Sequence, residues 1–298
     1  MRTYDERPSG QVGAGTVTRG SPTAQRRRLG RLLRSLREQA GLNGEDAGAA
    51  VERSASWLSR IESGQAALRL RELRDLLGVY GVTDPARIAS FEQLANAGRQ
   101  RGWWSDYSDV SSTFARYVGL ETDAAAISTF EDRVIPGLLQ SPGYMRALFN
   151  LAVPAPSPEV IEARIQVRAR RQQILREADR PRFSLVLDEA VLRRRIGGAE
   201  VAREQLAHLL DAIDRQHVDL QILTFAGGAV MPLHAFTLLQ FSEDPAVVYI
   251  DTLTGGVWEE GDTRTGTYAE IFAYLLTIAL DRPASRHLIQ VAKDALDS

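Results

Sequence analysis

The chain has 298 residues, which is enough for about two domains. Its apolar fraction of 44% and charged fraction of 25% are ordinary for a globular protein. It contains no cysteine, which excludes disulfide bonds, thiolate zinc sites and cysteine nucleophiles, and which suits a reducing cytoplasm. The sequence has no apolar run long enough to span a membrane and no signal-peptide core, so we expect a cytoplasmic protein without a membrane partner.

Charge is unevenly distributed along the chain. Residues 1–100 hold 16 arginines against 11 acidic residues, a net charge of +5, so the remainder carries −7 of the total of −2. The segment 26–37 alone contains six arginines and no acidic residue. A solvated helix face is the ordinary explanation of such a run, but beside a DNA-reading motif it would lie near phosphates.

Residues 1–24 are rich in Gly, Ser, Thr and Pro and predict a disordered arm. Residues 25–97 predict an all-α domain of about five helices. The fourth of these has an inward stripe formed by Leu70, Leu73, Leu76, Leu77 and Tyr80. The segment Asn96-Ala97-Gly98 with the arginines after it predicts a domain boundary, so residues 98–298 form the second domain.

The most informative segment is LNGEDAGAAVERSASWLSRIESG at 42–64, which predicts two short helices and a tight turn. Asn43 and Ser54 are suited to cap the two helices. Leu58 and Ile61 lie three residues apart on the inward face of the second helix. Gly64 is suited to end that helix as a left-handed cap. Two helices joined by about three residues are typical of a helix-turn-helix, whose second helix enters the major groove.

Residues 26–82 resemble a repressor-type helix-turn-helix domain of the xenobiotic-response-element (XRE) class. The resemblance is carried by Arg28-Leu29-Gly30-Arg31-Leu32-Leu33, by Ala40-Gly41-Leu42, and by Ser59-Arg60-Ile61-Glu62-x-Gly64. It implies that four residues face base edges: Ala55, Ser56, Ser59 and Arg60. Among these, Arg60 is able to make a bidentate contact to guanine. We expect phosphate contacts from Arg27, Arg28, Asn43, Ser54, Trp57 and Ser63.

The same resemblance implies an internal ion pair between Arg37 and Glu62. The chain also departs from the common pattern of the class. Glu52 stands where the turn usually has Gly, and Gly44 stands where many relatives carry Gln. These departures concern the contacts to DNA more than the fold.

The second domain predicts an α+β fold with a small, largely antiparallel sheet, its strands clustered in the last third of the chain. Trp103, Trp104 and Tyr107 open this domain, and we expect them to pack the domain junction. The expected strands cover 183–187, 218–225, 236–241 and 247–253, and the expected helices cover 158–178, 199–215, 266–280 and 284–296.

This half also resembles a large C-terminal domain of unknown function found in actinobacterial XRE-type regulators. The motifs WWSDYSDV, RRQQIL, LDEAVLRRRIGG and VVYIDTLTGG carry the resemblance in this order. Such proteins are described as antitoxin-like transcriptional regulators, often encoded beside a very small partner protein. Where relatives often have a histidine, this chain has Gly228-Ala229-Val230, so we transfer no role for that histidine.

The sequence contains no recognisable catalytic constellation. Its four histidines lack metal-ligand spacing, and Lys293 is the only lysine. We therefore expect neither an enzyme nor a cofactor nor a metal. A candidate effector or partner pocket is formed by Trp103, Trp104, Asp251 and Trp258.

Three hypotheses follow from the residues and the resemblances. The first is a sequence-specific DNA-binding transcriptional regulator, expected to be a homodimer because one helix-turn-helix reads one half-site. Its C-terminal domain would bind a small-molecule effector or a small protein encoded nearby. The second is an antitoxin-like protein whose main activity is binding a small partner, with DNA binding for autoregulation. The third is an enzyme that the helix-turn-helix localises on DNA.

Overall fold

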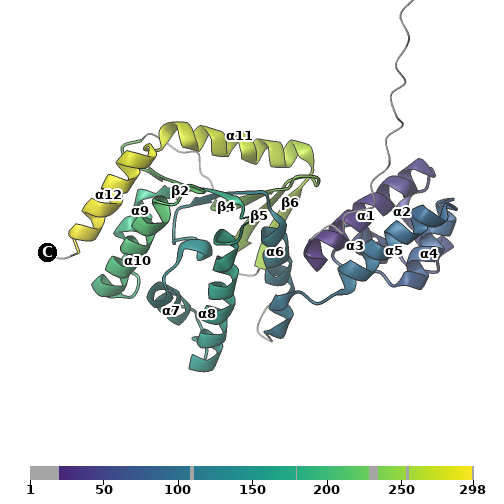
Figure 1. The fold of residues 1–298 in the computed structure, drawn as a ribbon, viewed down its shortest axis with the longest axis horizontal. Coiled ribbons are helices and arrows are strands. Elements are labelled where there is room, and N and C mark those ends of the chain that lie inside the picture. The colour runs from purple at the N-terminus through teal and green to yellow at the C-terminus, as the bar shows by residue number, and fades with distance from the viewer. Residues whose placement is uncertain (1–19, 108–110, 179, 228–233, 253–254, 297–298) are drawn as a thin grey trace, which may run out of the picture.

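The computed structural model describes residues 20–107, 111–178, 180–227, 234–252 and 255–296. A helical domain lies beside a larger domain built on one β-sheet (Figure 1). None of the described helices is both long and apolar enough to cross a membrane.

The helical domain contains five α-helices, as the sequence predicts. They are α1 (Pro22–Gln39), α2 (Gly44–Ala50), α3 (Ala55–Glu62), α4 (Leu70–Val79) and α5 (Pro85–Arg99). The predicted arm falls mainly outside the described residues, but its extent to residue 24 is wrong because α1 already begins at Pro22. The hydroxyl of Ser21 accepts a hydrogen bond from the Ala24 N–H, and proline suits the first helical position.

These five helices share one apolar core. The stripe predicted on α4 is confirmed: Leu73, Leu76, Leu77 and Tyr80 are buried, and Leu70 packs against them. Helices α1 and α3 add Leu29, Leu33, Leu58 and Ile61 to the same core.

The larger domain alternates strands and helices. Its strands are β1 (Ala126–Glu131), β2 (Arg182–Asp188), β3 (Val218–Leu223), β4 (Phe236–Gln240), β5 (Val247–Thr252) and β6 (Gly255–Glu260). Its α-helices are α6 (Ser112–Asp123), α7 (Pro142–Asn150), α8 (Pro158–Gln172), α9 (Glu189–Arg193), α10 (Gly198–Ile213), α11 (Asp262–Ile278) and α12 (Arg282–Asp294). Short 3₁₀ turns are η1 (Trp103–Asp106), η2 (Gly137–Leu139) and η3 (Gln173–Leu175).

All six strands form one mixed sheet in the order β3-β2-β1-β4-β5-β6. Strands β1, β2 and β3 are mutually parallel, whereas β4, β5 and β6 pair antiparallel. The prediction of a small, largely antiparallel sheet in the last third of the chain is therefore wrong. It missed β1, whose partners lie more than fifty residues away, and β6, whose Gly255 and Gly256 are poor strand formers.

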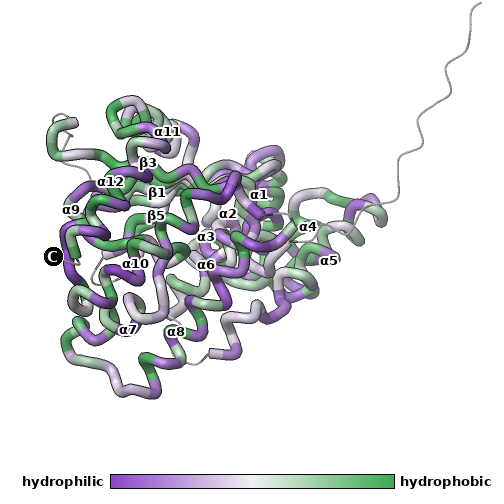
Figure 2. The backbone as a smooth tube through the Cα atoms, turned by 60° about the vertical axis from the view of Figure 1, so that its left-hand side comes forward, coloured by the Kyte–Doolittle hydropathy of each residue, from purple (hydrophilic) through white to green (hydrophobic). Residues whose placement is uncertain are grey.

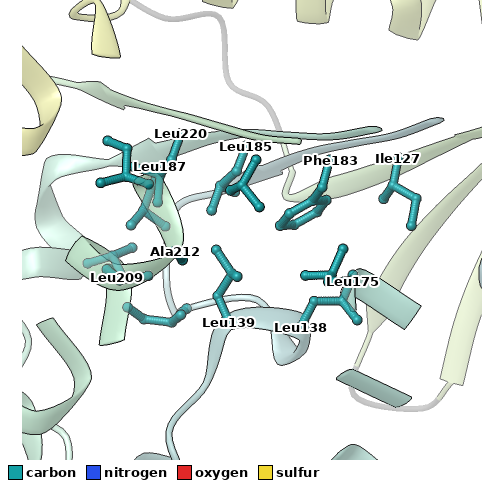
Figure 3. Packing of buried hydrophobic residues seen from close by; sticks show 14 of the residues in the cluster. Ile127, Leu138, Leu139, Leu175, Phe183, Leu185, Leu187, Leu209, Ala212 and Leu220 are labelled. Atoms are coloured by element: carbon teal, nitrogen blue, oxygen red, sulfur yellow. The ribbon is translucent and has the colours of Figure 1, made fainter. Parts of the chain in front are cut away.

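The sheet lies between two layers of helices. Helix α11 covers one face, where Phe272 and Leu275 pack on Phe130, Val186 and Val248. Helices α6, α7, α8 and α10 lie on the opposite side (Figure 1). There, leucines of η2 and α10 face Phe183, Leu185 and Leu220 (Figure 3). Most helices change repeatedly between hydrophobic and hydrophilic colours along their length, as expected when one side is buried (Figure 2).

Candidate functional site

Helices α2 and α3 form the predicted helix-turn-helix. The Asn43 side-chain oxygen accepts hydrogen bonds from the N–H groups of Glu45 and Asp46, at 2.9 and 2.8 Å. Ser54 caps α3 by accepting from the Trp57 N–H at 3.1 Å. Glu52 occupies the turn with φ of 56°, a left-handed conformation that favours glycine, and Gly64 ends the motif with φ of 69°.

The residues predicted to contact bases share one open surface. Ala55, Ser56, Ser59 and Arg60 are all exposed on α3, and Leu58 and Ile61 are buried on its other side. Asn43 and Ser54 are also exposed. Trp57 and Ser63 are half-buried, and the Trp57 ring lies 5.8 Å from the Arg53 guanidinium carbon. Their roles at DNA stay predictions.

The ion pair expected between Arg37 and Glu62 joins α1 to α3. Arg37 donates through Nε to Glu62 Oε1 at 2.6 Å and through Nη2 to Glu62 Oε2 at 3.0 Å. Its third nitrogen donates to the Leu42 carbonyl at 2.8 Å. The side chains are only 12% and 10% exposed, and the hydrogen bond to Glu62 raises the pKa of Arg37. The pair therefore fixes α3 against the basic first helix.

Arg27 and Arg28 lie at the junction between the two domains. Arg27 is buried, donates to the Pro245 carbonyl at 2.8 Å, and has its Nε 3.7 Å from Glu260 Oε2. Burial lowers the pKa of its guanidinium. Arg28 Nη1 lies 2.9 Å from Glu243 Oε2, and Arg31 pairs with Asp244. In this arrangement Arg27 is not open to a phosphate, so its predicted contact requires the junction to open.

The junction also reaches the outward side of α3. A groove of 370 Å³ separates Ser59 and Ser63 from Asp244, Glu260 and Asp262 of the larger domain. The lining also includes Glu62 and the arginines Arg27, Arg31 and Arg34, of which Arg27 and Arg31 face Glu260 and Asp244. A DNA backbone in this groove would meet four carboxylates against three guanidinium groups. The closed arrangement therefore opposes DNA at the second half of the recognition helix.

The four residues proposed for one effector or partner pocket lie in three places. Trp104 and Trp258 line a groove of 750 Å³ between the domains, and Arg60 lines the same groove. Trp103 packs edge-on against Trp104, with ring centroids 5.8 Å apart, and lies under Arg170. Asp251 lines a separate cavity inside the larger domain.

That separate cavity has a volume of 530 Å³ and lies between the sheet and α8. Its charged side chains include Glu131, Arg168 and Arg171, besides Asp251. The sequence analysis missed the first three. Glu131 belongs to the unpredicted strand β1, whereas Arg168 and Arg171 lie on the predicted helix at 158–178, where the sequence does not distinguish them from its other arginines. Among the described residues, no group of three potential metal ligands comes together.

The fold and the recognition helix together define a two-domain helix-turn-helix protein. Residues 28–91 match the family described as a helix-turn-helix domain. Residues 114–291, more than half of the chain, match the family described as a domain of unknown function, DUF5753. The chain therefore belongs to the DUF5753 family and carries a helix-turn-helix domain before its DUF5753 domain. No curated protein and no solved structure matches the chain.

Proposed function

We propose that this protein is a sequence-specific DNA-binding transcriptional regulator of the cytoplasm, related to XRE-type repressors and acting as a homodimer. The observation that carries the proposal is the capped helix-turn-helix with an exposed α3. Ala55, Ser56, Ser59 and Arg60 would read base edges, and Arg60 would supply the bidentate contact to guanine. A dimer supplies two recognition helices to a two-fold operator.

The larger domain would regulate access to DNA. Carboxylates of Glu243, Asp244 and Glu260 neutralise arginines of α1 that would otherwise approach phosphates. A protein that neutralises phosphates with arginine gains affinity from counterion release. Opening the junction would expose these arginines and remove the carboxylates from the path of the duplex, so the closed arrangement is the low-affinity state.

Two kinds of signal fit this arrangement. A small-molecule effector could bind the cavity beside α8, or a small partner protein could bind at the junction. The second is the antitoxin-like alternative, in which partner binding is the main activity and DNA binding serves autoregulation. Co-purification with a small neighbouring gene product would favour this alternative. A third alternative is an enzyme localised on DNA, which a metabolite bound to the protein in native mass spectrometry would favour.

Fluorescence anisotropy with the protein's own promoter region and with scrambled DNA tests the proposal. We expect tighter binding to the promoter at moderate salt, and we expect Arg60→Ala to cost about 1–3 kcal/mol of this preference. The matched control is Arg87→Ala, which removes an exposed arginine of α5. Equal affinity for both DNA sequences would contradict the proposal.

A further inference from the structure

The floor of the cavity in the larger domain is a polar patch on an otherwise apolar sheet face. Thr129 of β1 pairs in register with Thr237 of β4, which pairs with Tyr249 of β5. In the parallel half of the sheet, the residues in register with Thr129 are Leu185 of β2 and Leu220 of β3. Polar side chains therefore replace leucines only where the sheet lines the cavity.

The opposite wall contains two arginines, one turn apart on α8, with different surroundings. Arg171 forms a buried bidentate pair with Glu121, including a hydrogen bond of 2.9 Å from Nη2 to Oε1. Arg171 also lies over the ring of Tyr117, 5.0 Å from its centroid. Its charge is neutralised within the protein.

Arg168 has no such carboxylate. It donates through Nη1 to the Gln140 side-chain oxygen at 2.5 Å and lies 4.5 Å from the centroid of Phe149. Its Nε–H is buried and has no hydrogen-bond partner in the described part of the chain. Buried donors in proteins are normally satisfied, so this group indicates a partner from outside the chain.

The charges around Arg168 favour an anion. Burial and the neighbouring Arg171 lower the pKa of Arg168 to about 9, so it remains a cation at neutral pH. Burial and Asp132 raise the pKa of Glu131 to about 8, so this carboxyl is mostly protonated there and can donate a hydrogen bond. Asp251 is the remaining carboxylate of the lining. The cavity thus contains a guanidinium without a bidentate carboxylate partner, the Asp251 carboxylate, a neutral carboxyl group and aromatic walls.

The position of the cavity is one at which α/β proteins commonly bind ligands. The chain continues from β1 into parallel strands on one side, whereas β4 occupies the other side. Glu131 lies at the carboxyl end of β1, and open α/β sheets commonly bind ligands beyond the carboxyl ends of their parallel strands. A volume of 530 Å³ also lies within the usual range of small-molecule sites.

We propose that this cavity binds a small organic oxyanion with a flat apolar body, whose oxygens accept hydrogen bonds from the fork of Arg168. The body lies on Tyr117 and Tyr249, and the protonated Glu131 donates to a polar group of the ligand. The inference rests on the proposed function, because this ligand would be the effector of the regulator. The oxyanion is a carboxylate or a phosphate.

The cavity is connected to the domain junction through aromatic contacts. Tyr249 lies 4.8 Å from Trp258, measured between ring centroids. The Arg116 guanidinium covers Trp258 at 4.4 Å and pairs with Glu260, the carboxylate nearest Arg27. A ligand that packs on Tyr249 of β5 would therefore shift Trp258 and Glu260 of β6, the strand whose Glu260 faces Arg27 of α1.

Ligand-observed NMR on the full chain, with benzoate, phenyl phosphate and the neutral benzamide as probes, tests the binding. We expect at least one anion to bind about tenfold or more tightly than benzamide, as a charged hydrogen-bond pair implies. Binding of benzoate alone identifies a carboxylate site, and binding of phenyl phosphate alone identifies a phosphate site.

Variants of α8 assign the binding to Arg168. Arg168→Gln should weaken the bound anion about tenfold or more. Arg168→Lys keeps the positive charge but loses the planar guanidinium, so it should weaken anion binding by an intermediate factor. Because it retains the charge, it also serves as the control for misfolding of Arg168→Gln. Arg170→Gln, on the same helix but outside the cavity, should change nothing.

Equal binding of benzamide, no binding of either anion, or full binding by both Arg168 variants would overturn the inference. None of these outcomes affects promoter recognition by α3. A protein that binds its promoter but no anion would therefore retain the proposed function without this effector site.

Discussion

Two largely buried arginines, one in each domain, have different surroundings. In the helical domain, Arg37 is surrounded by Glu62 and the Leu42 carbonyl, so its whole guanidinium is paired. In the cavity of the larger domain, Arg168 has one amide oxygen and an Nε–H without a partner. A buried charge that serves the fold has its counterion in the chain, whereas one without a counterion indicates a site that a ligand completes.

Removing the Arg37–Glu62 ion pair should have the largest effect on stability. Arg37→Ala leaves the Glu62 carboxylate almost buried without a partner, so we expect a loss of about 3–5 kcal/mol in the free energy of unfolding. Urea denaturation measures it. Arg74→Ala is the control, because Arg74 pairs with Glu92 on the surface, where ion pairs contribute little to stability. Similar losses in both variants would contradict the structural role of Arg37.

Arg168 and Arg171 of α8 allow a paired and an unpaired buried arginine to be compared within one helix. Arg171→Gln leaves the buried Glu121 carboxylate without its ion-pair partner, so it should lower the free energy of unfolding by roughly 3–5 kcal/mol. Arg168→Gln breaks no ion pair and removes only the hydrogen bond to Gln140, so its cost should be smaller, about 1–3 kcal/mol in the absence of ligand. Denaturation of both variants under one condition distinguishes them. A loss for Arg168→Gln as large as that for Arg171→Gln would show that Arg168 serves the fold.

Glu131 gives the cavity a pH dependence. Because its folded pKa of about 8 exceeds its ordinary value, the stabilising effect of its protonation is present in acid and is lost as pH rises through the folded pKa. Relative to Glu131→Gln, the wild-type protein should lose roughly 2–5 kcal/mol of unfolding free energy between about pH 4.5 and pH 8.5. Parallel stability curves for the two proteins would show that the carboxyl is not desolvated.

Local patterns predicted most of the helical domain. The caps at Asn43 and Ser54, the left-handed Gly64 and the inward stripe of α4 all depend on neighbouring residues. The Arg37–Glu62 pair came from the resemblance instead, since the two residues are 25 positions apart. The start of α1 was missed although a serine followed by proline, as at Ser21-Pro22, is a common local signal for the first turn of a helix.

The larger domain was predicted less well because its sheet depends on distant pairing. β1 is recognisable only through its partners β2 and β4, and with β1 missing Glu131 could not be placed. The same limit applies to the junction. The basic run at 26–37 was interpreted as a phosphate contact, but its carboxylate partners lie more than two hundred residues further along the chain.

The central claim is that the larger domain holds the basic helix α1 away from DNA. Its most direct test is the promoter affinity of the double variant Glu243→Gln and Asp244→Asn, measured by anisotropy at moderate salt. We predict affinity higher than wild type by roughly three- to tenfold, with a steeper salt dependence, because Arg28 and Arg31 become free for phosphates. The control is Glu159→Gln with Glu162→Gln on α8, which changes the net charge equally at exposed positions. Unchanged affinity in the junction variant, or an equal gain in the control, would contradict the claim.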